Sequence, residues 1–528
     1  MSAVATASPA AAAPITKVNP RTGETLYTLA EPSEAMLAEV MQRAAAVYEQ
    51  LKRTTIQERI AETLKLRDYL IAHQQDIAEA IVRENGKCIT DALVGDVFTC
   101  VDLIDHYAKA APKILADEKV STPIMLMGKK SKIMYCPIGP VLVIAPWNYP
   151  LNTALTPALC AYLAGNPVVI KTSEWTPLKG VLDRILQESG VFKDAFQVVF
   201  GGRDTGRRLV ALHPAKIFFT GSVRGGKEVL AQAAPHLIPV ELELGGKDPM
   251  LVFADAHLDR AVHGAVWGAL NNSGQGCTSV ERCFVERAIY NVFLERLKTE
   301  FGRLSTTDTF SAPEDRGELQ LGCITTPFQL EKIAGQVQAA RVQGAEVWTA
   351  YPPRAAAPMV PPTIVTGASA GMDVQREETF GPVITVTPFD SEEEAIHLAN
   401  DTEYGLSSSV WTGDLARAER VARAMEAGNV CINDVMISEG NSALPFGGVK
   451  QSGMGRYKSA VGLRNFCNIK SIIVDKGKKK KEAHWYPYTA EKYRLFQQVL
   501  SAMGQHGLSK WLRLIKAGLR LDKAAQRS

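Results

Sequence analysis

One stretch, from Glu243 to Cys277, constrains this chain more than any other. Apolar residues and glutamates alternate over residues 240–244 with a period of two, which predicts a strand, and Gly245-Gly246 predicts a turn at its end. An apolar helical repeat follows, and residues 271–278 then predict a polar, glycine-flanked loop that carries one thiol. Any fold of this chain therefore has to connect a strand end to a cysteine loop through one turn and one helix.

Glu243 and Cys277 are the two groups that a covalent catalyst needs. A thiolate is a nucleophile, and a carboxylate can act as the base that releases what the nucleophile captures. An ordinary thiol has a pKa of about 8.5. We therefore expect the activity of such a catalyst to be highest at alkaline pH, unless the site lowers the pKa of the thiol. Each residue also has an ordinary structural explanation, because most cysteines are small buried residues and a glutamate at a strand end is usually solvated.

The composition indicates a globular enzyme of two or three domains. The 528 residues include 46% hydrophobic residues, 41 Gly and 28 Pro, which is typical of a loop-rich α/β protein, and no apolar run reaches the roughly 18 residues that span a bilayer. Residues 1–14, rich in Ala, Ser and Pro, predict a flexible arm and not a signal peptide. The nine cysteines are scattered, which favours free thiols in a cytoplasmic, reducing compartment, and no Cys/His spacing predicts a metal site.

Two more predicted strands, at residues 167–170 and 217–220, end in loops that suit a dinucleotide. After the first of them, Lys171 and Glu174 are placed to bracket an adenosine ribose. A carboxylate on the ribose hydroxyls repels a 2′-phosphate, so Glu174 favours NAD, although nearby basic residues leave NADP open. In isolation, such a pair on a loop is usually solvated.

The loop after residues 217–220 is a glycine turn that leads into a predicted helix. It is not Gly-x-Gly-x-x-Gly, but Gly221 and Gly226 allow close backbone approach, and a helix start at Ser222 offers unpaired N–H groups to a phosphate. Another buried strand, at 139–145, runs into Asn148, whose amide can point at a developing oxyanion or simply form a turn.

Residues 478–528 form a basic tail. They contain twelve Lys or Arg against three acidic residues, whereas residues 1–477 are mildly acidic and give no indication of nucleic-acid binding. A helical repeat places Leu508, Trp511, Leu512, Ile515 and Leu519 on one face and Lys510, Arg513, Lys516, Arg520 and Lys523 on the others. The pattern predicts peripheral attachment to an anionic membrane surface, and a helix docked on its own protein is the alternative.

Glu-Leu-Gly-Gly-Lys at 243–247 and Gly-Gln-Gly-Cys at 274–277 resemble the aldehyde dehydrogenase superfamily. Further blocks in the expected order extend the resemblance over about residues 15–477: 146–150, 377–383, 400–406, 428–433 and 445–456. Tyr457 stands where the family often has Glu, and we expect this departure to have no catalytic meaning. The tail is similar to that of fatty aldehyde dehydrogenases, but it lacks a spanning segment.

The resemblance implies roles for individual residues. Asn148 and the backbone N–H of Cys277 would hold the oxyanion, and Trp147 would line the dinucleotide's phosphates. Glu378 would hold the nicotinamide ribose, and Phe380 would pack against the nicotinamide ring.

The resemblance also implies an α/β fold of two doubly wound parallel-sheet domains with a small β oligomerisation extension, assembled as a homodimer or homotetramer. The NAD(P)-binding domain would comprise residues 15–118 and 138–244, and the catalytic domain residues 245–466. The oligomerisation strands would lie at 119–137 and 467–477, followed by the tail.

The predicted reaction is the NAD(P)-dependent oxidation of an aldehyde to the acid, through a thiohemiacetal and a thioester on Cys277. Transfer of the acyl group to coenzyme A is one alternative, against which Glu243 counts, and a non-catalytic binding or structural protein on the same fold is another. Asn152, Thr153 and Thr156 predict a small, polar substrate wall, whereas the apolar tail favours a medium- or long-chain aliphatic aldehyde.

Overall fold

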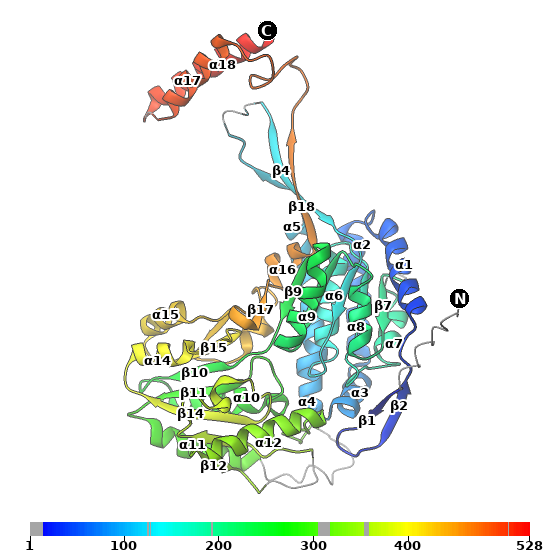
Figure 1. Cartoon of the computed structure of the whole chain (residues 1–528), viewed down its shortest axis with the longest axis vertical. Coiled ribbons are helices and arrows are strands. Elements are labelled where there is room, and N and C mark those ends of the chain that lie inside the picture. Colours follow the sequence, from blue (N-terminus) through cyan, green and yellow to red (C-terminus); the bar gives the residue numbers. More distant parts are fainter. Residues whose placement is uncertain are drawn as a thin grey trace, which may run out of the picture. The chain divides into compact units, whose positions relative to one another are not determined.

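The computed structural model describes residues 14–123, 126, 128–191, 194–304, 317–352, 358–504 and 506–527. The predicted arm lies outside the described residues apart from Pro14, and so does the side chain of Leu508. The chain divides into two compact units, Met1–Leu115 with Cys136–Asn468, and Ala116–Tyr135 with Ile469–Ser528. Figure 1 labels the elements.

The first unit contains a six-stranded sheet of order β17-β9-β8-β5-β6-β7, in which all neighbours are parallel except β17 and β9. Its strands are β5 (Val141–Ile144), β6 (Val168–Lys171), β7 (Phe196–Val199), β8 (Lys216–Thr220), β9 (Val240–Glu243) and β17 (Gly453–Met454). The helices of this half are α1 (Glu34–Leu51), α2 (Ile56–Ala72), α3 (Gln74–Asn85), α4 (Ile89–Ala92), the π-helix η1 (Leu93–Phe98), α5 (Thr99–Ile114), α6 (Asn152–Leu163), α7 (Leu182–Glu188), α8 (Arg203–Val210), α9 (Val223–Ala233) and α16 (Ser459–Asn465), with the 3₁₀ turn η3 (Ala234–His236). A hairpin of β1 (Ile15–Val18) and β2 (Thr25–Leu29) precedes them, with its turn at residues 19–23.

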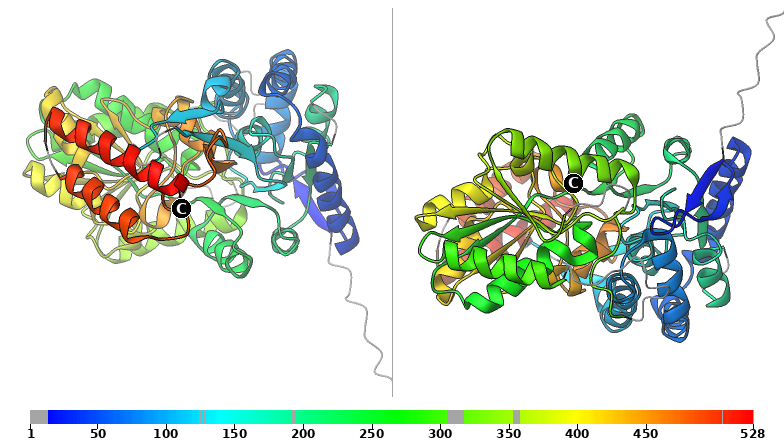
Figure 2. Two further views of the ribbon diagram at one scale, coloured as in Figure 1. Left: turned by 90° about the horizontal axis from the view of Figure 1, so that it is seen from above. Right: turned by 90° about the horizontal axis from the view of Figure 1, so that it is seen from below.

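Burial on both faces of this sheet explains why its strands read as continuous apolar runs. Val141 and Val143 of β5 pack into a core with α2, α5 and α6, whereas Leu142 and Ile144 pack into a second core with α1 and α8. Helices therefore cover both faces, as the views in Figure 2 show.

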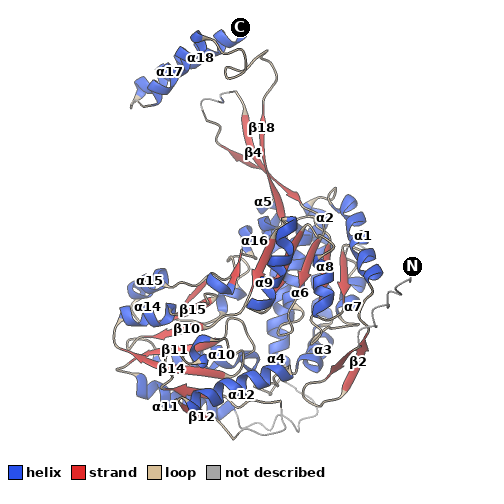
Figure 3. Ribbon diagram, in the orientation of Figure 1, coloured by secondary structure: helices blue, strands red, loops and turns tan. Residues whose placement is uncertain are grey.

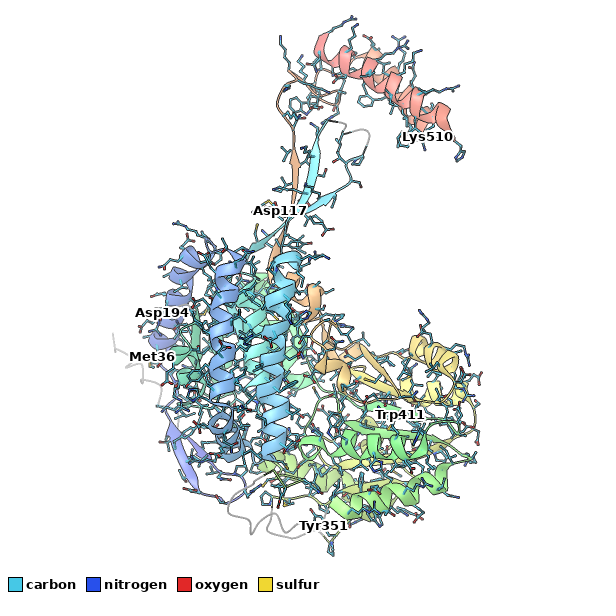
Figure 4. The ribbon with its side chains drawn as sticks, turned by 180° about the vertical axis from the view of Figure 1, so that it is seen from behind. Met36, Asp117, Asp194, Tyr351, Trp411 and Lys510 are labelled. Atoms are coloured by element: carbon cyan, nitrogen blue, oxygen red, sulfur yellow. The ribbon has the colours of Figure 1, made fainter. Side chains whose placement is uncertain are left out.

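A seven-stranded sheet of order β12-β13-β14-β11-β10-β15-β16 forms the other half of the first unit, and only β12 is antiparallel to its neighbour. Its strands are β10 (Asp248–Val252), β11 (Val280–Glu286), β12 (Glu346–Thr349), β13 (Thr363–Thr366), β14 (Val383–Phe389), β15 (Ser407–Trp411) and β16 (Asn429–Ile432). Around them lie α10 (Leu258–Leu270), η4 (Asn271–Gly274), α11 (Tyr290–Leu304), α12 (Pro327–Val342), α13 (Asp373–Arg376), α14 (Glu392–Asn400), α15 (Leu415–Ala424), η5 (Ile437–Gly440) and η6 (Lys450–Ser452). Trp411 on β15 is labelled in Figure 4.

Two largely parallel sheets with helices on both faces confirm the predicted fold class (Figure 3). The domain boundaries remain a prediction. Two contacts join the end of the range 245–466 to the first half. Strand β17 pairs with β9, and the Asn166 side chain donates to the carbonyl of Phe466 at 2.8 Å.

The second unit contains β3 (Glu118–Val120), most of β4 (Lys130–Pro137) and β18 (Cys467–Val474), in the order β18-β4-β3, and two helices, α17 (Ala490–Met503) and α18 (Leu508–Arg527). The helices lie side by side (Figure 2). Val499 and Ala502 share a buried cluster with Leu514 and Ala517, and Leu495 shares another with residues near the end of α18, so the two helices are antiparallel. No helix among the described residues is both long and apolar enough to cross a bilayer.

A buried ion pair holds the loop between β5 and α6. The Lys87 ammonium lies 3.0 Å from an Asp96 carboxylate oxygen, and neither side chain is exposed. Asp96 also accepts the N–H groups of Leu151 and Asn152, at 3.0 and 3.2 Å, where α6 begins, and Lys87 donates to the carbonyl of Asn148 at 2.7 Å. One aspartate thus satisfies a buried cation and a helix start that would otherwise lack partners.

We predict that Asp96→Ala lowers the free energy of unfolding by about 3–5 kcal/mol, because it leaves a buried ammonium and two backbone N–H groups unpaired. Urea unfolding followed by tryptophan fluorescence measures the loss. Asp105→Ala is the matched control, because Asp105 pairs with Arg67 at the surface and its loss should cost less than about 1 kcal/mol. Equal midpoints for the two variants would contradict the structural role of Asp96.

Candidate active site

A cavity of about 860 Å³ lies in the first unit and is lined by both of its sheet-bearing halves. On the first sheet, the strand order reverses between β5 and β8, and the residues that follow these two strands line the cavity. This is the position at which doubly wound sheets receive nucleotides. Ten of the eleven predicted site residues line it: Asn148, Trp147, Lys171, Glu174, Gly221, Ser222, Glu243, Cys277, Glu378 and Phe380.

Gly226 is the exception. It is buried in the first turns of α9, and a Cβ there would lie 2.7 Å from the Leu244 side chain. The absence of a side chain therefore serves the packing of α9 against the end of β9.

Glu243 ends β9 and lines the cavity. Its side chain is buried, and neither carboxylate oxygen has a hydrogen-bond partner among the described residues. Burial raises the pKa of this carboxyl well above its ordinary value, and the neighbouring Glu241 raises it further. The alternation seen in the sequence does not give β9 a solvated face, because Glu241 is also buried and pairs with Lys216 at 3.0 Å.

Cys277 lies on the loop between η4 and β11. Its backbone N–H has no partner among the described residues, and its side chain is partly exposed where it lines the cavity. Burial raises the pKa of the thiol well above its ordinary value. The carboxylates of Glu439, Asp248 and Glu243 raise it further, in that order of size. The site therefore does not lower the thiol pKa.

Gly246 brings this loop to the end of β9. A Cβ at Gly246 would lie 2.4 Å from the carbonyl oxygen of Cys277, so any other residue would push the two segments apart. The contact explains why the glycine turn predicted after residue 244 is needed here.

Asn148 reaches the same loop from the other side. Its side-chain amide donates to the carbonyl of Gln275 at 3.0 Å, and Asn272 donates to the Asn148 carbonyl at 3.1 Å. An amide nitrogen carries two N–H groups, so one remains for a ligand in the cavity.

The residues predicted to hold a dinucleotide fit one. Lys171, buried at the end of β6, pairs with Glu174 at 3.4 Å, and burial lowers the pKa of the lysine. Ser222 caps the start of α9, where the remaining N–H groups favour an anion. A Cβ at Gly221 would lie 2.8 Å from the Phe219 ring, so the turn leaves room only for backbone.

Glu378 and Phe380 sit on a loop held by a buried ion pair that the sequence did not reveal. Lys247 pairs with Glu281, and the carboxylate of Glu281 accepts the N–H groups of Thr379 and Phe380, the latter at 2.8 Å. Glu378 accepts the N–H of Gly246 at 3.0 Å, and burial raises its pKa to about 7. The Phe380 ring meets Trp147 edge to face, at 5.3 Å between centroids.

Two further acid–base groups on the cavity wall were missed. Glu439 lines the cavity and contributes to the raised pKa of Cys277, but it lies between the recognised blocks, where the sequence gave no signal. Tyr457, set aside as a departure without meaning, also lines the cavity.

Of the predicted polar wall, Thr153 lines the cavity, whereas Asn152 and Thr156 are buried and hydrogen-bonded to each other at 2.6 Å.

Among the described residues, no cluster of three or more His, Cys, Asp or Glu side chains is placed to hold a metal ion.

Comparison with known proteins gives one consistent result. The family model for the aldehyde dehydrogenase family matches residues 7–472. The 4,4'-diapolycopene aldehyde oxidase of Methylomonas sp is 38% identical over 491 residues, covering 92% of this chain and 90% of that protein. The betaine aldehyde dehydrogenase of Agrobacterium fabrum is 36% identical and covers 88% of this chain and 93% of its own.

Solved structures agree. An aldehyde dehydrogenase from Brucella melitensis is 32% identical with a TM-score of 0.82, covering 88% of this chain and 94% of that one. An NAD+ complex of an aldehyde dehydrogenase from Bacillus cereus is 30% identical with a TM-score of 0.82, over the same shares of the two chains. The chain belongs to the aldehyde dehydrogenase family and is an NAD(P)-dependent oxidoreductase.

Proposed function

We propose that this enzyme oxidises an apolar aldehyde to its carboxylic acid through a covalent intermediate on Cys277. The observation that carries the proposal is that a partly exposed thiol and an unpartnered buried carboxyl, Glu243, line one cavity beside a nucleotide-receiving sheet edge. A non-catalytic protein would not need to leave a buried carboxyl without partners, because such a group costs stability.

The chemistry follows from the positions of these groups. Cys277, as thiolate, attacks the carbonyl carbon, and the free N–H of Asn148 with the backbone N–H of Cys277 stabilises the oxyanion. A bound NAD(P)+ would supply the acceptor for the hydride that leaves the captured carbon. Glu243 then takes a proton from the water that hydrolyses the remaining thioester, and this role argues against transfer to coenzyme A.

Residues on the sheet edge would hold the cofactor. Ser222 and the start of α9 would bind the phosphates, Glu174 the adenosine ribose, and Glu378 the nicotinamide ribose, with Trp147 and Phe380 as walls. Glu174 favours NAD over NADP. Arg203, one possible partner of a 2′-phosphate, is already paired with Glu228.

Away from the cofactor side, Tyr149, Pro157, Met436 and Phe446 line the cavity, which supports an apolar substrate. The diapolycopene aldehyde oxidase alignment adds to this support. It leaves out 8% of this chain, less than the share formed by residues 478–528, so it reaches into the tail. Long-chain aliphatic or polyene aldehydes fit both observations.

Glu439 favours a second candidate. A carboxylate on the cavity wall suits a cationic aldehyde, and several relatives are betaine aldehyde dehydrogenases. A higher kcat/KM for betaine aldehyde than for an aliphatic aldehyde of similar length would decide for this substrate class.

The tail supports attachment to an anionic membrane. In α18 the buried face contains Leu514, Ala517 and Leu521, so the predicted apolar face is not the one that docks on α17. Exposed on α18 are Trp511, Leu512, Ile515, Leu519, Arg513, Lys516, Arg520 and Lys523. Apolar residues flanked by a basic stripe match the chemistry of an anionic lipid surface, and Lys510 marks this helix in Figure 4.

Assembly as a homo-oligomer stays a proposal, which rests on the sheet β18-β4-β3. Ile469 and Ile473 of β18 are exposed large apolar residues, as an interface strand requires.

We predict that Cys277→Ala abolishes NADH formation and that Cys136→Ala, a thiol outside the cavity, does not. Steady-state rates with an aliphatic aldehyde panel measure the difference, and the product is the free acid without added coenzyme A. Turnover that survives in Cys277→Ala, or that requires coenzyme A, refutes the mechanism.

The reactive form of Cys277 should accumulate only as pH rises, because burial and nearby carboxylates raise the thiol pKa. Glu439→Gln removes one of these carboxylates and should therefore shift the pH profile of Cys277 alkylation by iodoacetamide to lower pH. Glu419→Gln, which changes an exposed carboxylate on α15, is the control. An unchanged profile in Glu439→Gln would show that Glu439 does not act on the thiol.

Leu512→Glu should lower the fraction of enzyme bound to vesicles of phosphatidylcholine and phosphatidylglycerol by on the order of tenfold. The reason is that the apolar contact between the Leu512 side chain and the lipid is lost. Leu415→Glu is the matched control, since Leu415 on α15 is 68% exposed and Leu512 is 71% exposed. In the same vesicles, oxidation of a long-chain aldehyde should fall in Leu512→Glu, whereas oxidation of butanal should not. Equal sedimentation of the two variants with these vesicles removes the membrane proposal. Binding of the wild type to neutral vesicles that equals its binding to the anionic ones also removes it.

A further inference from the structure

Tyr457 is fixed in the wall of the cavity by its backbone and by its ring. Its N–H donates to the Phe446 carbonyl at 2.9 Å and its own carbonyl accepts the Phe446 N–H at 2.8 Å. The ring packs edge to face against Phe218 and Phe446, at centroid distances of 5.2 and 5.5 Å, and the residue is 7% exposed. Such packing leaves the phenol little freedom to move.

The phenol hydroxyl has no hydrogen bond to a described residue, and Tyr457 lines the same cavity as Glu243 and Cys277. The charges of both groups act on it, because Glu439, Glu243 and Cys277 each add to the effect of burial in raising the Tyr457 pKa. Glu243 likewise has two carboxylate oxygens without partners. The three residues line one cavity without bonding to each other, and water is a molecule that suits a donor, an acceptor and a thiol.

Two other hydroxyls that line the cavity are already engaged. Tyr149 donates to the Asn271 side chain at 2.8 Å, and Thr153 donates to the Tyr149 carbonyl at 2.7 Å. Tyr457 is therefore the phenol on this wall whose hydroxyl is left for a ligand in the cavity.

We propose that Tyr457 positions the water that hydrolyses the thioester on Cys277, an inference that rests on the proposed function. Its oxygen accepts one hydrogen of the water. The other hydrogen of the water goes to a carboxylate oxygen of Glu243 as the water oxygen bonds to the acyl carbon. The carbon–sulfur bond breaks, the electron pair leaves on the sulfur of Cys277, and the acid departs.

The test uses p-nitrophenyl acetate, which acylates the thiol without any cofactor. In rapid mixing, the burst of p-nitrophenol reports acylation of Cys277, and the slope that follows reports hydrolysis of the acetyl-enzyme. Tyr457→Phe should keep the burst and lower the slope about tenfold, the loss expected for one hydrogen bond. Acetyl-enzyme should accumulate in the intact mass spectrum, and hydroxylamine, a stronger nucleophile than water, should restore the slope.

Tyr290→Phe is the matched control. Its hydroxyl makes one long bond of 3.4 Å to the Val386 carbonyl and does not line the cavity, so burst and slope should equal those of the wild type. Glu243→Gln should resemble Tyr457→Phe, because both variants impair the same step.

The outcomes separate this inference from the function on which it rests. An unchanged slope in Tyr457→Phe, or a burst that falls together with the slope, overturns the positioning role while the wild-type burst keeps the thioester mechanism. A wild-type protein without a burst, or a burst that survives in Cys277→Ala, overturns both.

Discussion

The close approach of Gly246 to the Cys277 carbonyl is the contact on which the site depends. The two residues belong to segments that leave different sheets, one following β9 and the other preceding β11. Because a Cβ at Gly246 would lie 2.4 Å from that carbonyl oxygen, the spacing between the segments is set by backbone alone. Gly245 is equally restricted, since a Cβ there would lie 2.7 Å from the Glu378 carboxylate. The turn therefore fixes the nucleophile loop and the Glu378 loop against one strand end.

Buried charges, more than apolar packing, orient the remaining loops. Asp96 with Lys87 holds the loop of Asn148, and Lys247 with Glu281 holds the loop of Phe380. In each pair the carboxylate accepts backbone N–H groups besides the ammonium, so its desolvation is offset by several bonds. Such pairs contribute less to stability than their geometry suggests, but removing one partner leaves a buried charge unpaired. They fix geometry at the site.

Local patterns predicted much of this molecule. Alternating and continuous apolar runs located β5, β6, β8 and β9, and the glycine turns located the ends at which cavity residues stand. The Lys247–Glu281 pair escaped prediction because its partners lie far apart in sequence and a buried lysine reads like a solvated one. Glu439 escaped because it lies between the recognised blocks, where no motif marks it.

Tyr457 and the tail show a different limit. The tyrosine was noticed only as a departure from a family pattern, and a pattern does not tell which wall a side chain joins. For α18 the periodicity predicted an apolar face with basic residues on the other faces, but Leu514, Ala517 and Leu521, which dock on α17, are not on the predicted apolar face. Which face of a helix is covered depends on its neighbour, and that neighbour is set by the tertiary fold.

The electrostatics of the cavity explain how one chamber can hold both a nucleophile and a base. Glu243 and Cys277 each raise the pKa of Tyr457, and Glu243 is among the groups that raise the pKa of the thiol. Two anions here oppose each other, so ionising one disfavours ionising the other. On the proposed mechanism this opposition orders the steps. While the thiolate is needed, Glu243 is held in its neutral form. Once the sulfur carries an acyl group its charge is gone, and Glu243 can ionise and accept a proton from water at the stage when a base is required.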